Sequence, residues 1–323
     1  MRPTHAQELA VLQSVVYAAL FDYPLTLTQL RDNLVDVAAD EETIATWWRT
    51  SPLLQAAVEH REGRYFPAGR GDLIDTRARR EVLSRHLLHR NRRMLNLVAG
   101  MPFVRMVALS GSLAHLNAER SADVDLFVIT TANRVWLVTV AMLLISKFMG
   151  WRKRLCLNYV ISEQQMAITP TDLFAANQII HLQPIAGHTT YQRFLDANPF
   201  VARFYPNFQS KIGAGPVHRS LGEGGDPGIS WVEQLLSLGA AQIAEPVCRT
   251  VYRRHLRRRS SGWRSRDQVR LDDECLKLHT SSHRAETMAR FEAAMETATT
   301  KPAKDTKRRE GQGTGSPNQD TVA

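Results

Sequence analysis

The chain has few cysteines, and their number and spacing argue against a disulfide-rich protein and against a zinc-binding protein. Its 323 residues include three cysteines, Cys156, Cys248 and Cys275, and no Cys-x-x-Cys pair. Such scattered cysteines favour neither a disulfide framework nor a zinc site, and they fit a reducing compartment. We therefore expect a cytoplasmic protein without structural disulfides.

No segment is long and apolar enough to predict a membrane span. The N-terminal residues MRPTHAQELA lack the charged and then apolar order of a secretory signal. The best candidate, residues 135–151, reaches Lys147 after about a dozen mostly apolar residues, whereas a span needs about 20. We expect a buried helix there, and no membrane among the partners.

Basic residues outnumber acidic ones and gather on two predicted helices. Lys and Arg number 41 against 32 Asp and Glu, which gives a formal charge of +9. One predicted helix, 75–99, carries a face of arginines, and the end of another, 230–258, is also rich in arginine. A basic surface favours a polyanionic partner such as a nucleotide or RNA. Nucleic acid is therefore a possible partner.

Residues 1–74 predict three helices followed by a β-hairpin, an order that resembles a winged helix-turn-helix. The periodic apolar residues and the Glu62-Gly63 turn predict these elements: helices at 6–22, from Thr26 or Thr28, and at 40–50, and strands at 56–60 and 64–67. The third helix has Arg49 as its only cation and also carries Trp47 and Trp48. A helix that enters a DNA groove usually brings several cations. Packing or protein docking is therefore the preferred role, with DNA binding as the alternative.

The most informative stretch is residues 107–130, VALSGSLAHLNAERSADVDLFVIT. A short strand leads into a Ser-Gly-Ser turn at 110–112, and a second strand begins at Asp123. Because side chains alternate along a strand, Asp123 and Asp125 point to the same face. Two carboxylates aimed at one spot repel each other, so their pairing predicts a shared cation.

Gly111-Ser112, a spacing of about ten residues, and then Asp123-Val124-Asp125-Leu126 resemble the signature of the polymerase-beta-like nucleotidyltransferase superfamily. The resemblance implies a small mixed α/β core, with a nucleoside triphosphate (NTP) as substrate and Mg²⁺ or Mn²⁺ as cofactor. It also implies that Gly111 and Ser112 hold the phosphates. Asp123 and Asp125 would bind the metal and serve in catalysis.

The same resemblance implies a third carboxylate on a later strand. The predicted strand at 154–161 has Asn158 at its centre, and no acid follows before Glu163. An asparagine carbonyl can bind a metal, but the side chain cannot act as a base. We therefore place Asn158 in the catalytic set and leave two alternatives open. Either Glu163 or another acid substitutes, or the domain binds nucleotide without efficient turnover.

The expected fold class is α/β (α+β), with a small mixed-sheet nucleotidyltransferase core, an N-terminal winged-helix-like module and a helical C-terminal region. In residues 230–258 we expect one helix, kinked at Pro246, with Leu235, Leu236, Leu238, Ile243, Val247 and Val251 inside. A further helix should start near Thr169 and stop at Pro184. The predicted boundaries are 1–74 for the module, 75–212 for the core with its preceding basic helix, 213–229 for a linker, 230–298 for the helical region and 299–323 for a disordered tail.

The function predicted from the sequence is transfer of a nucleoside monophosphate from an NTP to an acceptor with Mg²⁺. The sequence does not identify the acceptor, which could be a protein, an RNA or a small molecule. Two alternatives stay open: a non-catalytic nucleotide-binding or regulatory protein on the same fold, and a nucleic-acid-binding protein.

Overall fold

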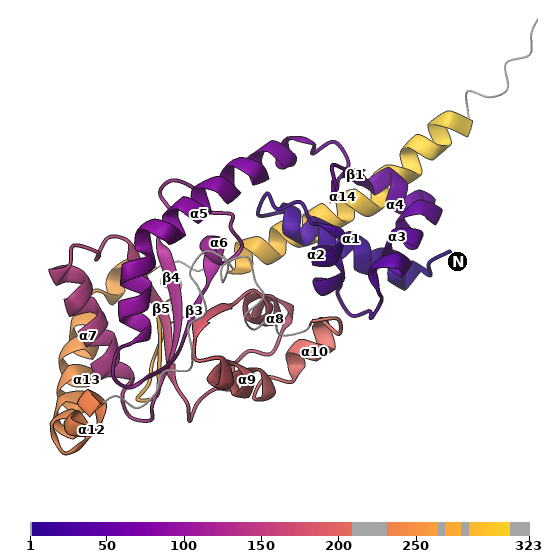
Figure 1. Ribbon diagram of the computed structural model, residues 1–323. Coiled ribbons are helices and arrows are strands. Elements are labelled where there is room, and N and C mark those ends of the chain that lie inside the picture. Colours follow the sequence, from indigo (N-terminus) through magenta and orange to yellow (C-terminus); the bar gives the residue numbers. More distant parts are fainter. Residues whose placement is uncertain (1, 209–230, 264–268, 279–283, 311–323) are drawn as a thin grey trace, which may run out of the picture. The chain divides into compact units, whose positions relative to one another are not determined.

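Helices and a mixed β-sheet make up the protein in the computed structural model (Figure 1), so the chain belongs to the α+β class. The structure describes residues 2–208, 231–263, 269–278 and 284–310. Two units are distinguished. The N-terminal unit comprises Met1–Ile74 and Glu286–Ala323, and the central unit comprises Asp75–Ala285.

Side-chain caps start the helices of the N-terminal unit. Thr4 and Thr26 each accept a hydrogen bond from the backbone three residues later, and the glutamine there bonds back to the threonine backbone. These capping boxes satisfy N–H groups that a helix leaves unpaired. The helices are α1 (His5–Ala19), α2 (Leu27–Asp32), α3 (Glu41–Thr50, capped by Asp40) and α4 (Pro52–Ala57, capped by Ser51).

The predicted hairpin is present as β1 (Val58–Arg61) and β2 (Arg64–Pro67). Glu62 and Gly63 both have positive φ angles, which suits the two-residue turn of a twisted hairpin. Trp48 of α3 donates its indole N–H to the Val58 carbonyl at 2.9 Å. The neighbouring Trp47 is buried. Both indoles therefore contribute to packing within this unit.

The central unit is built on a six-stranded sheet with the order β6-β3-β4-β5-β8-β7. Only β4 and β5 run parallel, and the other neighbours are antiparallel. In β3 and β4 every side chain is buried except Arg105 and Asp125. The strands are β3 (Val104–Leu109), β4 (Val124–Thr130), β5 (Leu155–Ser162), β6 (Gln183–Ala186), β7 (Val269–Leu271) and β8 (Cys275–Leu278).

Helices cover both faces of this sheet (Figure 1). Leu126 and Val128 of β4 belong to a core shared with α5, α7 and α13. Phe127 points to the other face, where its ring lies 5.1 Å from that of Phe194 in α9. Asp125 is two residues from Phe127 and therefore shares that second face. The helices are α5 (Asp72–Ala99), α6 (Gly111–Ala114), α7 (Val135–Phe148), α8 (Leu173–Ile180), α9 (His188–Asp196), α10 (Phe200–Phe204), α12 (Trp231–Ser237) and α13 (Ala240–Arg258).

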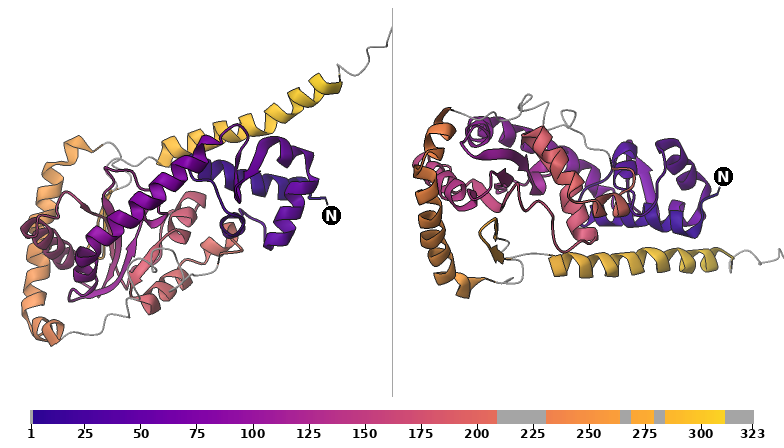
Figure 2. Two further views of the ribbon diagram at one scale, coloured as in Figure 1. Left: turned by 45° about the horizontal axis from the view of Figure 1, so that its top comes forward. Right: turned by 90° about the horizontal axis from the view of Figure 1, so that it is seen from below.

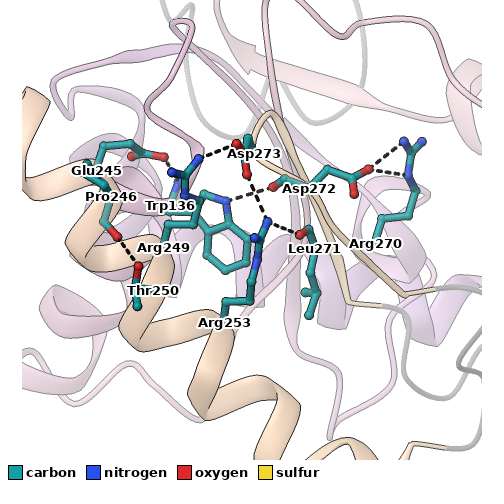
Figure 3. A network of polar contacts seen from close by, with 10 residues as sticks. All are labelled: Trp136, Glu245, Pro246, Arg249, Thr250, Arg253, Arg270, Leu271, Asp272 and Asp273. Carbon is teal, nitrogen blue, oxygen red and sulfur yellow. Dashed lines mark hydrogen bonds and ion pairs between the residues drawn. The ribbon is translucent and has the colours of Figure 1, made fainter.

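Long-range contacts anchor the C-terminal elements of this unit on α7 (Figure 3). The buried Glu245 carboxylate accepts hydrogen bonds from the backbone N–H groups of Trp136 and Leu137, at 3.1 and 2.7 Å. No local side chain caps α7, so Glu245 supplies the cap from α13. On the same helix, Arg253 lies over the Trp136 ring and pairs with Asp273 at 3.1 Å.

The helical region predicted at 230–298 also contains two strands. Strands β7 and β8 lie in it and extend the central sheet beside β5. They are short, with little periodicity of their own, so tertiary pairing decides them. Helix α14 (Arg284–Glu310) also runs past the predicted end at 298. The predicted linker at 213–229, and the tail beyond 310, lie outside the described residues.

The single helix predicted at 230–258 is instead two helices. The break falls at Gly239, which has a φ of 155°, while Pro246 lies inside α13. Of the predicted inner side chains, Leu236 packs against the core, but the residues that α13 buries are Ala241, Glu245 and Leu256. Most of the predicted set is exposed: Leu235, Leu238, Ile243, Val247 and Val251.

The structure also bears on two further predictions, the helix expected to stop at Pro184 and the apolar segment at 135–151. The helix expected to reach Pro184 ends at Ile180, and Pro184 lies in β6, an edge strand that tolerates its missing N–H. Residues 135–148 form the largely buried helix α7. Within the described residues, no helix combines the length and the apolar character needed to cross a bilayer.

Candidate functional site

The Ser-Gly-Ser turn lies directly against Asp125. The backbone N–H of Ser110 donates to the Asp125 carbonyl at 2.9 Å, which continues the pairing of β3 with β4. Gly111 follows with a φ of +63°, and a Cβ atom there would lie 2.6 Å from Asp125 Oδ2. Glycine is therefore required at this position for both its φ angle and its lack of a side chain.

Asp123 and Asp125 stand at the start of β4. Asp123 is exposed and Asp125 is half-buried, while Val124 between them is buried on the opposite face. Burial raises the pKa of Asp125 to about 6; a hydrogen bond with Cys156 opposes this shift, and the negative charge of Asp123 adds to it. Burial and the neighbouring carboxylate therefore both disfavour the charged form of Asp125.

Cys156, not an acid, occupies the position beside Asp125 on the neighbouring strand. The two residues are partners in the parallel pairing of β4 with β5. The register then shifts, because Leu126 pairs with Leu157 and Phe127 pairs with Tyr159. Asn158 is thus the extra residue of a β-bulge. Its side chain lies outside the described part of the structure.

Glu163 lies at the far end of the same pair of strands. Its N–H donates to the carbonyl of Thr130, the last residue of β4, at 2.9 Å. Five residues of extended chain separate Thr130 from Asp125, a distance of about 16 Å. The Glu163 carboxylate pairs with Arg193 at 3.7 Å. Glu163 is therefore too distant to share a metal ion with Asp125.

Helix α5 holds the loop that follows the turn. Arg77 is buried and donates to the His115 carbonyl at 2.8 Å. Arg80 pairs with Glu119 at 2.7 Å, and the Ser84 hydroxyl accepts from the Ala118 N–H at 2.9 Å. Two arginines of the predicted basic face thus serve this loop. Others on the helix are exposed: Arg79, Arg85, Arg90, Arg92 and Arg93.

Two histidines lie close to this loop. The His115 ring, directly after α6, has its centroid 4.1 Å from that of His181, directly after α8. Burial, and then the nearby His181 and Arg77, hold the pKa of His115 well below its usual range. Its imidazole is therefore neutral at pH 7. The sequence contains no periodic signal that pairs these two histidines.

No family model, curated protein or solved structure matches this chain. The chemistry available to the site is therefore the guide to function. Its elements are Gly111, which has no side chain, two carboxylates on one face and a thiol on the adjacent strand. Among the described residues, no three His, Cys, Asp or Glu side chains are placed to hold a metal together.

The structure brings together three of the residues predicted from the sequence, Gly111, Asp123 and Asp125, and Ser112 lies beside them in the turn. Cys156 was missed, because the register of β5 against β4 depends on tertiary pairing and is invisible in the sequence. Arg77 was predicted only as one cation of a basic face, and its contact with His115 depends on the packing of α5.

Proposed function

We propose that the central unit binds an NTP with Mg²⁺ or Mn²⁺ and transfers its nucleoside monophosphate to an acceptor, as in polymerase-beta-like nucleotidyltransferases. The contact between Gly111 and Asp125 carries this proposal. Because Gly111 has no side chain, phosphate oxygens could approach the backbone closely there. Phosphates bound at this point would lie next to the Asp125 carboxylate.

The donor set fits one divalent cation. Mg²⁺ is commonly bound by one or two carboxylates, with substrate phosphates and water as its other ligands. Asp123 and Asp125 supply those carboxylates, and a cation between them would offset the burial and repulsion that raise the pKa of Asp125. When bound, the metal would neutralise charge that develops on the phosphates.

The chain's own residues then have distinct tasks. The backbone at Gly111 and Ser112 would orient the triphosphate, and Asp123 and Asp125 would fix its position through the metal. Arg77 is a positioning residue, because it holds the loop that follows the turn. Transfer of this kind depends mainly on positioning and electrostatics.

A second candidate function is nucleotide binding without transfer. Two residues of β5 favour it: the partner of Asp125 is Cys156, and the position expected for the third carboxylate holds Asn158. Neither residue offers the carboxylate that would activate an acceptor hydroxyl. The two candidates share the same binding site and differ only in turnover.

The N-terminal unit is proposed to be a winged-helix-like module. The order of α1 to α4 followed by the β1–β2 hairpin supports this assignment. Its third helix uses Trp47 and Trp48 for packing within the unit, which favours docking over DNA reading. The nucleic-acid-binding alternative therefore has less support than the nucleotide site.

The proposal is tested with α-labelled NTPs, Mg²⁺ or Mn²⁺, and measurement of both equilibrium binding and pyrophosphate release. We expect saturable binding, with release that increases when the true acceptor is present. Asp123→Asn and Asp125→Asn should each lower release on the order of 100-fold. The matched control is Asp75→Asn, an exposed aspartate on α5. Saturable binding without release would select the second candidate, and no binding of any NTP would overturn both.

A further inference from the structure

Helices α12 and α13 expose an unusual density of large apolar side chains. Exposure ranges from 56% at Val247 to 85% at Leu238. The set comprises Trp231, Leu235, Leu238, Ile243, Val247 and Val251. Scattered exposed apolar residues are normal, but a contiguous group on one surface indicates an interaction site.

The apolar residues of α13 form one stripe. Ile243, Val247 and Val251 are four residues apart, so they follow one another along the same side of the helix. The opposite side carries Glu245 and Leu256, both buried. Figure 2 shows α13, in orange, at the outer edge of the central unit. The stripe is therefore separate from the core of this unit.

On the same two helices, arginine side chains are exposed to solvent and both carboxylates are buried. The carboxylates within Trp231–Arg259 are Glu233 and Glu245, and both are buried. Glu233 pairs with Arg105, and Glu245 caps α7. The last two turns of α13 and the residue after it expose a cluster of cations: Arg254, Arg257, Arg258 and Arg259.

Helix α7, which packs on α13, also exposes large apolar side chains next to a basic one. Leu144 and Phe148 lie four residues apart and are exposed, Phe148 to 88%. Lys147 lies between them and is exposed too. Arg152 follows shortly after, and both it and Arg259 act electrostatically on Tyr252.

The exposed apolar stripe and the arginines beside it limit the kind of partner that can bind this surface. A nucleic acid would engage the arginines but gain nothing from the aliphatic stripe. A second copy of the chain would bring the same excess of cations to the interface, which is unfavourable. An anionic bilayer offers both an apolar boundary and negatively charged headgroups.

We propose that the outer face of α12 and α13 docks on an anionic lipid bilayer. Ile243, Val247 and Val251 enter the boundary between headgroups and acyl chains, and Arg254 and Arg258 contact the headgroup phosphates. This contact is peripheral and involves no helix that crosses the bilayer. It does not depend on the proposed nucleotidyl transfer.

The test is co-sedimentation of the full-length protein with phosphatidylcholine vesicles, with and without phosphatidylglycerol. We expect binding to the mixed vesicles only, and weaker binding at higher salt. Removing positive charge with Arg254→Gln and Arg258→Gln should weaken partitioning roughly fivefold per arginine. Ile243→Ser with Val247→Ser should weaken it on the order of tenfold or more.

Matched control variants show whether vesicle binding depends on this surface or on any exposed valine or arginine of the protein. Val82→Ser changes an equally exposed valine on α5, and Arg92→Gln with Arg93→Gln removes two exposed arginines there. Both controls should bind vesicles as the wild type does. Absence of binding to mixed vesicles, or equal losses in the control variants, would overturn the proposal. So would self-association, measured by light scattering, that Val247→Ser abolishes while vesicle binding is unchanged.

Discussion

A Cβ atom on residue 111 would lie 2.6 Å from Oδ2 of Asp125. This contact links the end of β3 to the carboxylate of β4, and it makes Gly111 and Asp125 a structural pair. Any side chain at position 111 must displace the carboxylate that the proposed metal site needs.

The first prediction concerns Gly111→Ala. We expect loss of NTP binding and a decrease of about 1–3 kcal/mol in the free energy of unfolding, from backbone strain and the clash with Asp125. Gly150→Ala is the matched control, because Gly150 has a similar φ of +71° and no atom within 4 Å of a built Cβ. The control should show the strain alone and keep NTP binding. Urea denaturation and titration calorimetry measure the two effects. Equal loss of NTP binding in both variants would contradict the pairing of Gly111 with Asp125.

The second prediction follows from the pKa of Asp125, which is raised from 3.8 to about 6. The folded protein binds this proton more tightly than the unfolded chain, so the contribution of Asp125 to stability decreases as pH rises from about 4 to about 6. Divalent cations compete with the proton. Mg²⁺ affinity should therefore increase as pH rises through about 6 and level off above it.

The Asp125→Asn variant checks the origin of this pH dependence. Asparagine cannot ionise, so the variant should unfold at a higher urea concentration than the wild type at pH 8, where the wild-type carboxylate is charged. It should also lose the pH-dependent step in Mg²⁺ affinity. A step that persists in Asp125→Asn would assign the titration to another group.

The third prediction concerns the residue beside Asp125. Cys156→Asp would place a carboxylate on β5 beside Asp125, and we expect tighter Mn²⁺ binding because the site gains a negative ligand. If the missing acid limits turnover, pyrophosphate release should rise as well. Cys156→Ser replaces the thiol with a hydroxyl that can also donate a hydrogen bond to Asp125. Its Mn²⁺ affinity should equal that of the wild type. Weaker Mn²⁺ binding in Cys156→Asp than in Cys156→Ser would show that this position does not face the metal.

The fourth prediction concerns the cap that Glu245 provides to α7. Glu245→Ala would leave the N–H groups of Trp136 and Leu137 without this partner, at a cost of about 1–3 kcal/mol in the free energy of unfolding. Glu119→Ala breaks an ion pair whose carboxylate is exposed, and it should cost less than about 1 kcal/mol. Urea denaturation compares the two. Equal costs would contradict the capping role of Glu245.

The sequence by itself determined the features that depend on neighbours along the chain. Alternation along β4 places Asp123 and Asp125 on one face, and the Glu62-Gly63 turn specifies the β1–β2 hairpin. The Ser-Gly-Ser motif likewise marks the end of β3, although helix α6 begins there at Gly111. These interactions span only a few residues, so their patterns can be read directly.

Tertiary structure decided what depends on pairing between distant segments. The register of β5 against β4 puts Cys156 beside Asp125, and the length of the strand takes Glu163 to the other end. Helix α13 has apolar residues on two sides, and the sequence does not say which side is buried. Packing on α7 selects the side with Glu245, because its carboxylate caps that helix, and Ile243, Val247 and Val251 are left exposed. Register and burial are set by contacts between segments far apart in the chain, and these exist only once it has folded.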